Sequence, residues 1–157
     1  MGMVIALLAA AALGLAFATE WWGGVVPCAL CLWERWPYRV AIALGLFAAI
    51  APRALVRPAL GLLLLTILVG VALAGIHTGV EFGWWPSPLA ECAAPNLGTG
   101  SIAQRLAAMP ARPAKPCDDP TFLIPFLPVS MAAMNLLFSL GLAALIVAFP
   151  GRRPGRR

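Results

Sequence analysis

Four long apolar stretches constrain most strongly what this chain can fold into. They cover residues 3–22, 40–51, 60–76 and 128–149. A helix needs roughly 20 residues to cross a bilayer, and each stretch reaches that length with modest extension. Of the 157 residues, 62% are hydrophobic and 11% are charged, and a soluble globule of this size could not bury so much apolar surface. The sequence therefore predicts a membrane protein.

Backbone polar groups in lipid must be satisfied within the chain, which segments of this length achieve as helices. We therefore expect an all-α membrane protein: one domain over residues 1–157, built as a four transmembrane-helix bundle. The expected segments are helices at about 3–22, 28–51, 58–77 and 128–149, a long proline-rich periplasmic loop at about 78–127 and a tail at 150–157. A cleaved signal peptide is the alternative for the first stretch, but no basic residue precedes it, which favours a retained helix.

Basic residues set the expected orientation, because they favour the cytoplasmic side. Arg53 and Arg57 lie between the second and third helices, and the tail at 150–157 holds four more arginines. Both termini then belong in the cytoplasm and the long loop outside. All six tryptophans fall at helix ends on the outer side, where indole rings favour the interface. The net charge of +5 comes mostly from these cytoplasmic basic residues, so it reflects the topology, and we expect no nucleic-acid partner.

The four cysteines all fall outside the membrane or at its outer interface in this topology. They are Cys28, Cys31, Cys92 and Cys117. An oxidising compartment permits disulfides, so two pairs are expected. Of the three possible connectivities, the spacing favours Cys28–Cys31 locally and Cys92–Cys117 across the long loop.

The close pair lies where the second helix is expected to begin. Pro27 suits the first turn of a helix, which would put Cys28 at the helix N-terminus, where thiolate is favoured. Cys31 and Arg35 follow at i+3 and i+7 and therefore share its face. An arginine nearer the lipid needs a partner or a function. Arg35 can stabilise a thiolate on Cys31 and bind a polar head group such as a quinone carbonyl.

Other interpretations of the pair remain open. A CxxC pair can be a structural staple, although so small a loop constrains the unfolded chain little. A zinc site lacks a second CxxC, because Cys92 and Cys117 are 25 residues apart, and c-type haem attachment needs a histidine where Leu32 stands. The spacing alone favours redox chemistry, and no metal is expected.

Two polar residues, His77 and Glu34, are expected near this pair. His77, the only histidine, is expected at the depth of Arg35, either in a shared head-group site or as an ordinary interfacial residue. Glu34 is expected to pair with Arg35 or Arg39, or to be solvated, with no catalytic role. Arg35 itself can alternatively snorkel to the interface.

The run C-A-L-C-L-W-E-R, a histidine after the third helix, P-S-P-L-A-E-C and a later loop cysteine resemble the DsbB-type disulfide bond formation proteins. The resemblance covers essentially the whole chain. It implies an enzyme of the bacterial inner membrane, a protein dithiol:quinone oxidoreductase. Such an enzyme reoxidises a periplasmic thioredoxin-like DsbA-type oxidase and passes the electrons to ubiquinone or menaquinone.

The resemblance also implies a role for each cysteine. Cys92 would be attacked by the partner's thiolate, forming a mixed disulfide between the two proteins. Cys117 would exchange with the first pair through Cys28. Cys31 would then be the thiolate stacked on the quinone.

For the quinone, the resemblance implies that Arg35 holds the ring and that His77 lies near it. Two other functions compete with this one. The chain can be a membrane assembly or binding protein with two structural disulfides, or a metal-binding membrane protein.

Overall fold

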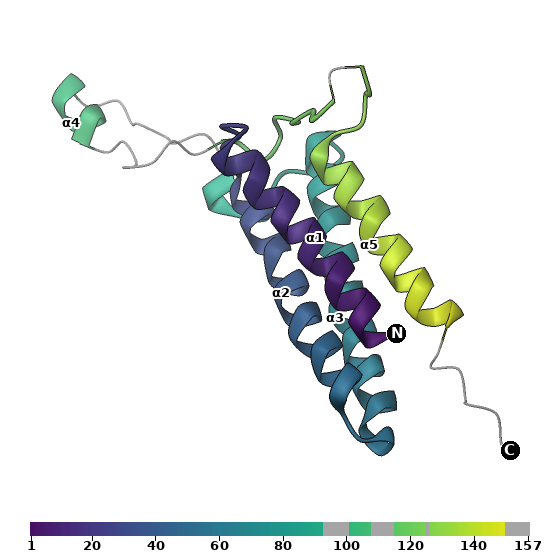
Figure 1. The fold of residues 1–157 in the computed structure, drawn as a ribbon. Coiled ribbons are helices and arrows are strands. Elements are labelled where there is room, and N and C mark those ends of the chain that lie inside the picture. Colours follow the sequence, from purple (N-terminus) through teal and green to yellow (C-terminus); the bar gives the residue numbers. More distant parts are fainter. Residues whose placement is uncertain (93–100, 108–114, 125, 150–157) are drawn as a thin grey trace, which may run out of the picture.

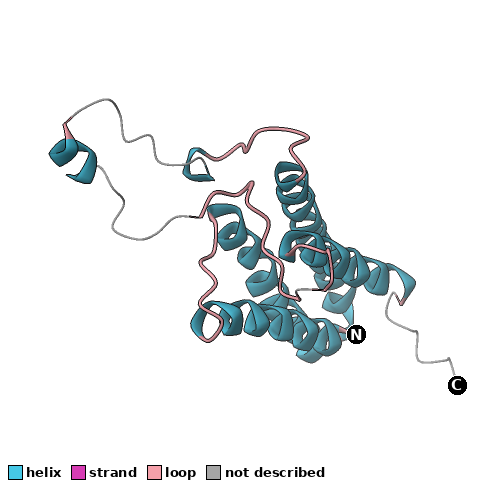
Figure 2. Cartoon of the chain, turned by 90° about the horizontal axis from the view of Figure 1, so that it is seen from above, coloured by secondary structure: helices cyan, strands magenta, loops and turns pink. Residues whose placement is uncertain are grey.

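A computed structural model describes residues 1–92, 101–107, 115–124 and 126–149. The expected tail and the rest of the long loop lie outside these residues. Four long helices run up and down beside one another (Figure 1): α1 (Gly2–Trp21), α2 (Ala29–Ile50), α3 (Arg53–Glu81) and α5 (Met131–Ala148). The connection from α3 to α5 contains the short helices η1 (Ala90–Cys92) and α4 (Ile102–Ala107). The described part of the chain is all-helical, and Figure 2 shows no strand in it.

Local signals end and begin the helices around the long connection. At Gly83 the chain takes φ of +69°, a left-handed conformation that favours glycine and ends α3. Because that signal lies well beyond His77, α3 continues past the expected range of 58–77. At the other side of the connection, Ser130 caps α5, and its Oγ accepts a hydrogen bond from the Ala133 N–H at 3.2 Å.

The helices pack in the order α1, α2, α3, α5, and no comparable contact between α5 and α1 closes the ring. Their shared core contains small and branched side chains, among them Ile5, Ala41, Leu63 and Ile146. Where α1 crosses α2, glycine allows close approach. A Cβ added to Gly2 would lie 2.5 Å from the carbonyl oxygen of Gly45 in α2. Such small-residue crossings are typical of helices packed in membranes.

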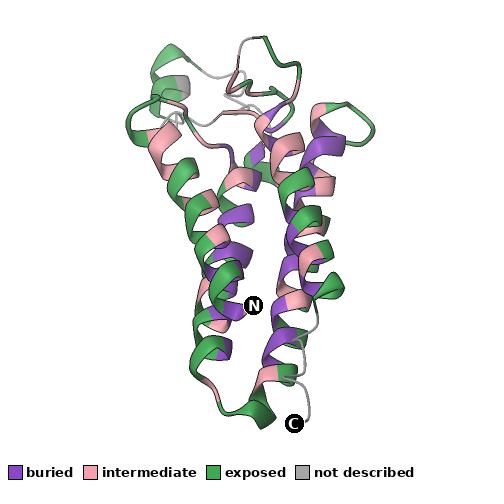
Figure 3. Ribbon diagram, turned by 45° about the vertical axis from the view of Figure 1, so that its right-hand side comes forward, coloured by how far each residue is buried: buried purple, intermediate pink, exposed green. Residues whose placement is uncertain are grey.

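The outer surface of the bundle is apolar. Figure 3 shows the buried positions facing inward and the exposed ones covering the outer faces of the helices. Large apolar side chains such as Leu7, Leu62 and Leu137 are among those exposed. Three helices, α1, α3 and α5, are long and apolar enough to cross a membrane. The fourth long helix, α2, differs because Glu34, Arg35 and Arg39 lie in its first half.

Candidate functional site

The CxxC pair lies at the start of α2. The sequence predicts Pro27 in the first helical turn, but the helix begins at Ala29 because Cys28 takes the N-cap position. The Cys28 sulfur accepts a hydrogen bond from the Cys31 N–H at 3.2 Å. The two sulfurs lie 2.8 Å apart, longer than the bond of about 2.05 Å in a disulfide. The expected Cys28–Cys31 disulfide is therefore absent from this structure, which contains both residues as free thiols.

The environment of Cys28 favours its thiolate. Its side chain is buried, and its pKa is lowered from the ordinary value mainly because the Cys31 side chain hydrogen-bonds to it. The N–H groups of Cys31 and Leu30 lower the pKa further. Burial and the negative charge of Glu34 act in the opposite direction without cancelling the effect. Cys28 is thus the cysteine of the pair that loses its proton more readily.

The second cysteine pair is a disulfide, as the spacing predicts. Cys92, at the end of η1, is bonded to Cys117, and both residues are buried. The Cys117 N–H also donates to the Cys92 carbonyl oxygen at 3.2 Å. The bond joins two residues that lie 25 apart in the sequence.

The structure brings both pairs together. Cys28, Cys92 and Cys117 belong to one buried cluster that also contains Leu30 and Val80, and Cys31 packs against it. The backbone of Cys28 also forms a parallel bridge with Lys115, two residues before Cys117. A dithiol and a disulfide therefore lie side by side, which the sequence alone did not establish.

Arg35 is buried and reaches across to α1. Its Nη1 lies 2.8 Å from Glu20 Oε2, and its guanidinium stacks over the Phe17 ring at 4.8 Å. It therefore does not snorkel to the surface. Glu20 was not singled out as its partner, although it is the only acidic residue in the first apolar stretch. An acidic and a basic side chain in neighbouring apolar helices are expected to pair.

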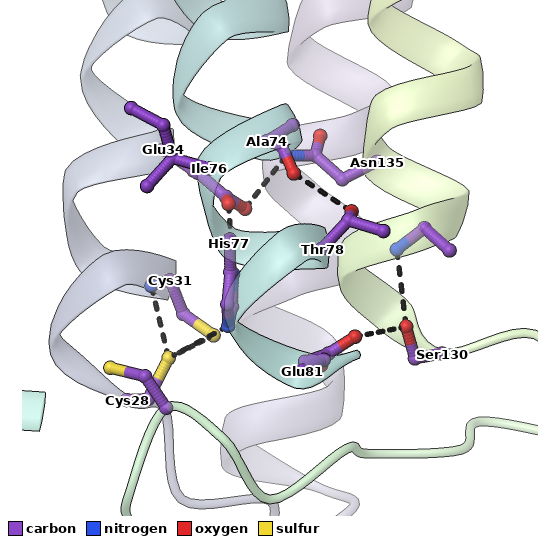
Figure 4. Close-up of polar contacts among 12 residues, drawn as sticks. Cys28, Cys31, Glu34, Ala74, Ile76, His77, Thr78, Glu81, Ser130 and Asn135 are labelled. Atoms are coloured by element: carbon purple, nitrogen blue, oxygen red, sulfur yellow. Dashed lines mark hydrogen bonds and ion pairs between the residues drawn. The ribbon is translucent and has the colours of Figure 1, made fainter. Parts of the chain in front are cut away.

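His77 contacts the close cysteine pair directly. Its Nε2 lies 3.4 Å from Cys28 Sγ, and its Nδ1 lies 2.8 Å from Glu34 Oε1 (Figure 4). The other carboxylate oxygen of Glu34 accepts a hydrogen bond from Asn135 Nδ2 on α5 at 2.7 Å. The expectation that Glu34 pairs with Arg35 or Arg39 or is solvated was wrong. Its side chain points into the bundle and is buried.

This polar network continues deeper between the helices. The Tyr38 hydroxyl on α2 is hydrogen-bonded to Asn135 and lies 2.9 Å from Ser139 Oγ, both on α5. Sequence reasoning assigned no function to these three residues. The signal was present, because Asn135 and Ser139 interrupt an otherwise apolar stretch, where polar groups need partners.

A cavity of about 410 Å³ adjoins these residues. Cys28, Cys31 and Arg35 line it on the α2 side, together with His77 of α3. Its other walls come from α1 and α5, and from the loop segments that precede α2 and α5. The remaining lining is largely apolar and includes Leu8, Ala12, Ala16, Met134 and Phe138.

Cys28, Cys31 and His77 also present donor atoms within 4.8 Å of one another, as metal ligands would. A closed zinc site takes four ligands, and sulfurs 2.3 Å from a tetrahedral ion lie about 3.8 Å apart. The two sulfurs here are closer, and the other two cysteines are bonded to each other. The donor set fits hydrogen bonding between thiols and imidazole better than it fits a structural zinc site.

Comparison with known proteins agrees with this geometry. The family model described as Disulfide bond formation protein DsbB matches residues 1–149. An uncharacterized protein of Rickettsia prowazekii (strain Madrid E) is 32% identical over 155 residues, which is 96% of this chain and 88% of the relative. No solved structure matches the chain. With its apolar helices and its paired cysteines, the chain is a membrane protein that belongs to the DsbB family of disulfide bond formation proteins.

Proposed function

We propose that this protein is a membrane dithiol:quinone oxidoreductase. It reoxidises a periplasmic DsbA-like dithiol oxidase and passes the electrons to ubiquinone or menaquinone. The observation that supports this most is the dithiol of Cys28 and Cys31 packed beside the buried Cys92–Cys117 disulfide. Thiol–disulfide exchange transfers a disulfide by thiolate attack, so two adjacent pairs can pass oxidation from one to the other.

The proposed topology has four membrane spans, because α2 crosses the membrane in addition to α1, α3 and α5. Its 22 residues are long enough, and Glu34 and Arg35 have buried partners that reduce the cost of their charges in lipid. Arg53 and Arg57, beside the α2–α3 turn, favour the cytoplasm for that end. Both cysteine pairs, at the opposite end, then lie on the periplasmic side of the inner membrane.

The cysteines act in series, starting from two disulfides. The partner's thiolate attacks Cys92, which breaks the Cys92–Cys117 bond and forms a mixed disulfide. Cys117 leaves as a thiolate and attacks Cys28, so that a Cys28–Cys117 bond forms and Cys31 is released as a thiolate. The partner's second thiolate then attacks the mixed disulfide, and the partner leaves oxidised. The released Cys92 thiolate attacks Cys117, which restores the Cys92–Cys117 bond and releases Cys28. Two electrons from the partner then reside on the Cys28–Cys31 dithiol, and both of these residues line the cavity.

The cavity fits a quinone head group. Its volume lies within the range of about 300–1,000 Å³ found for small-molecule sites, and its walls are mainly apolar. Arg35 has five N–H groups, and Glu20 is bonded at Nη1, which leaves donors for a carbonyl oxygen. Arg35 would hold the ring, with Cys31 and His77 beside it. When bound, the quinone supplies an acceptor for two electrons and two protons.

A trapped intermediate tests the proposal. In the Cys117→Ser variant Cys92 is a free thiol, and its thiolate should attack the disulfide of an oxidised DsbA-like oxidase. One partner sulfur then leaves as a thiolate, and the mixed disulfide should appear as a disulfide-linked heterodimer on a non-reducing gel. The matched control, Cys92→Ser, should trap nothing. If the disulfides are only structural, both variants would lose stability and neither would trap a partner, which would overturn the proposal.

A further inference from the structure

A line of polar groups joins the buried Cys28 sulfur to the half-buried Asn135 on α5. His77 of α3 contacts Cys28, Glu34 of α2 contacts His77, and Asn135 of α5 contacts Glu34 (Figure 4). Both oxygens of the Glu34 carboxylate are occupied, one by each neighbour. The proposed electron path through the cysteines and Arg35 does not use Glu34.

The hydrogen bonds define how His77 is oriented. An ionised carboxylate only accepts hydrogen bonds, so His77 Nδ1 must donate to Glu34. In neutral imidazole the other nitrogen, Nε2, is then the acceptor, and it faces Cys28 Sγ at 3.4 Å. Asn135 fixes the second carboxylate oxygen at 2.7 Å and so limits rotation of the Glu34 side chain. The nitrogen of His77 that can accept a proton, Nε2, therefore faces the Cys28 thiol.

We propose that Glu34 is a positioning residue that, anchored by Asn135, holds His77 as the acceptor of the Cys28 proton. This inference deepens the proposed function and rests on it. The arrangement is that of a thiol, a base and a carboxylate that orients the base. A buried carboxylate in an apolar bundle is costly unless it is paired or functional, and this one is both.

The proton balance is simple. In the first step the Cys28 S–H bond breaks, its proton binds His77 Nε2, and a thiolate–imidazolium pair forms beside the Glu34 carboxylate. When Cys28 and Cys31 close to a disulfide, one S–S bond forms in place of two S–H bonds. Two electrons and two protons leave for the quinone, and one of those protons leaves from His77.

A direct charge effect predicts the opposite result of removing the Glu34 charge. The negative charge of Glu34, acting directly on Cys28, raises the pKa of that thiol. Removing the charge would then lower the pKa and speed thiolate formation. If Glu34 acts through His77, its loss destabilises the imidazolium and slows thiolate formation. The other charged or titratable groups lining the site are Cys31, Arg35, Tyr38, Glu20, Glu81, Lys115 and Asp119.

The test is a pH profile of Cys28 alkylation in the reduced full-length protein. A small alkylating reagent can reach Cys28 through the cavity, and site-resolved mass spectrometry separates Cys28 from Cys31. Glu34→Gln keeps the shape but removes the charge, and should slow alkylation at neutral pH about tenfold, equivalent to one pKa unit. Glu34→Asp restores the charge and should recover most of the rate.

The matched control is Glu81→Gln, which removes a nearby carboxylate that is bonded to Ser130 rather than to His77. Because Glu81 is not bonded to His77, this variant should slow alkylation of Cys28 much less than Glu34→Gln does. An unchanged or faster rate in a folded Glu34→Gln protein, or equal slowing by Glu81→Gln, overturns the inference.

If Glu34→Gln fails to fold, Asn135→Ala decides the question, because it keeps the charge and removes its anchor. Slower Cys28 alkylation supports the positioning role, and an unchanged profile overturns it. The assay needs neither quinone nor partner protein. A wild-type protein without quinone-dependent activity would therefore overturn the proposed function and leave the alkylation result to be judged separately.

Discussion

The two cysteine pairs differ in what surrounds them. Cys28 and Cys31 are thiols at the start of a helix, where His77 and the Cys31 N–H contact the Cys28 sulfur. Cys92 and Cys117 form a disulfide in the apolar cluster that they share with Cys28, and a backbone hydrogen bond also joins these two residues. Polar contacts therefore influence the ionisation of the first pair, whereas the second pair is held in place by its covalent bond and by apolar packing.

This difference teaches that the two pairs should respond differently to substitution of their neighbours. We call Cys28 and Cys31 the membrane pair, and Cys92 and Cys117 the loop pair. Removing a polar neighbour should change the ionisation of the membrane pair, because individual hydrogen bonds stabilise its sulfurs. The loop pair should respond mainly to loss of its own sulfurs. Four predictions follow this contrast, in decreasing order of effect.

The largest effect should come from the sulfurs themselves. Cys31→Ser should lose all quinone-dependent oxidation with either the partner protein or a small dithiol as reductant. Cys92→Ser should lose activity with the partner but keep it with the small dithiol, which can reach the membrane pair through the cavity. The absorbance change of the quinone as it is reduced measures the activity of both variants with each reductant. Equal loss with both reductants in the two variants would contradict a division of labour between the pairs.

Next in size is the loss of the buried arginine. Arg35→Met should raise the KM for quinone by about 10- to 100-fold, since a hydrogen bond from a charged donor is worth about 1.5–3 kcal/mol. Initial rates at varied quinone concentration measure it. Trapping of the partner at Cys92 should be unaffected, because that step lies outside the cavity. Glu20→Gln, which leaves Arg35 in place, is the control and should have a smaller effect on KM.

The third effect concerns the pKa of Cys28. Cys31→Ala removes the side-chain hydrogen bond that is the main cause of the lowered pKa, so the pKa should rise. At neutral pH less thiolate is present, and alkylation of Cys28 should slow about tenfold, which corresponds to about one hydrogen bond to a charged group. The difference should disappear at pH values above both pKa values. A rate that is unaltered across the whole pH range would exclude this cause.

The smallest effect should come from a site outside both pairs. Ser130→Ala removes the N-cap of α5 and should lower the free energy of unfolding by about 1 kcal/mol. Thermal unfolding in detergent measures this loss. The alkylation profile of Cys28 should not change, which separates general stability from the electrostatics of the membrane pair.

The sequence predicted the elements of this molecule better than its contacts. The apolar stretches and the CxxC spacing identified the helices and the position of the close pair, because both signals are local. The Cys92–Cys117 pairing was also predicted, since four cysteines leave few connectivities.

The partners of buried charges could not be derived in the same way. Helical spacing puts Glu34 and Arg35 on adjacent faces of α2, but does not say which neighbouring helix each face meets. The structure directs Arg35 toward Glu20 on α1 and Glu34 toward His77 and Asn135. These partners depend on how the helices are arranged around α2, which only the folded chain defines.

The unclosed contact between α1 and α5 has a consequence for how reactants come and go. Residues of both helices line the cavity, so the quinone of the proposed function would enter and leave sideways between them while its hydrocarbon tail stayed among the lipids. Exchange of spent for fresh acceptor then requires no aqueous gate and no large rearrangement of the bundle. Under the proposed function, the quinone would reach the site by two-dimensional diffusion in the bilayer, and the reaction rate should depend on the quinone content of the surrounding membrane.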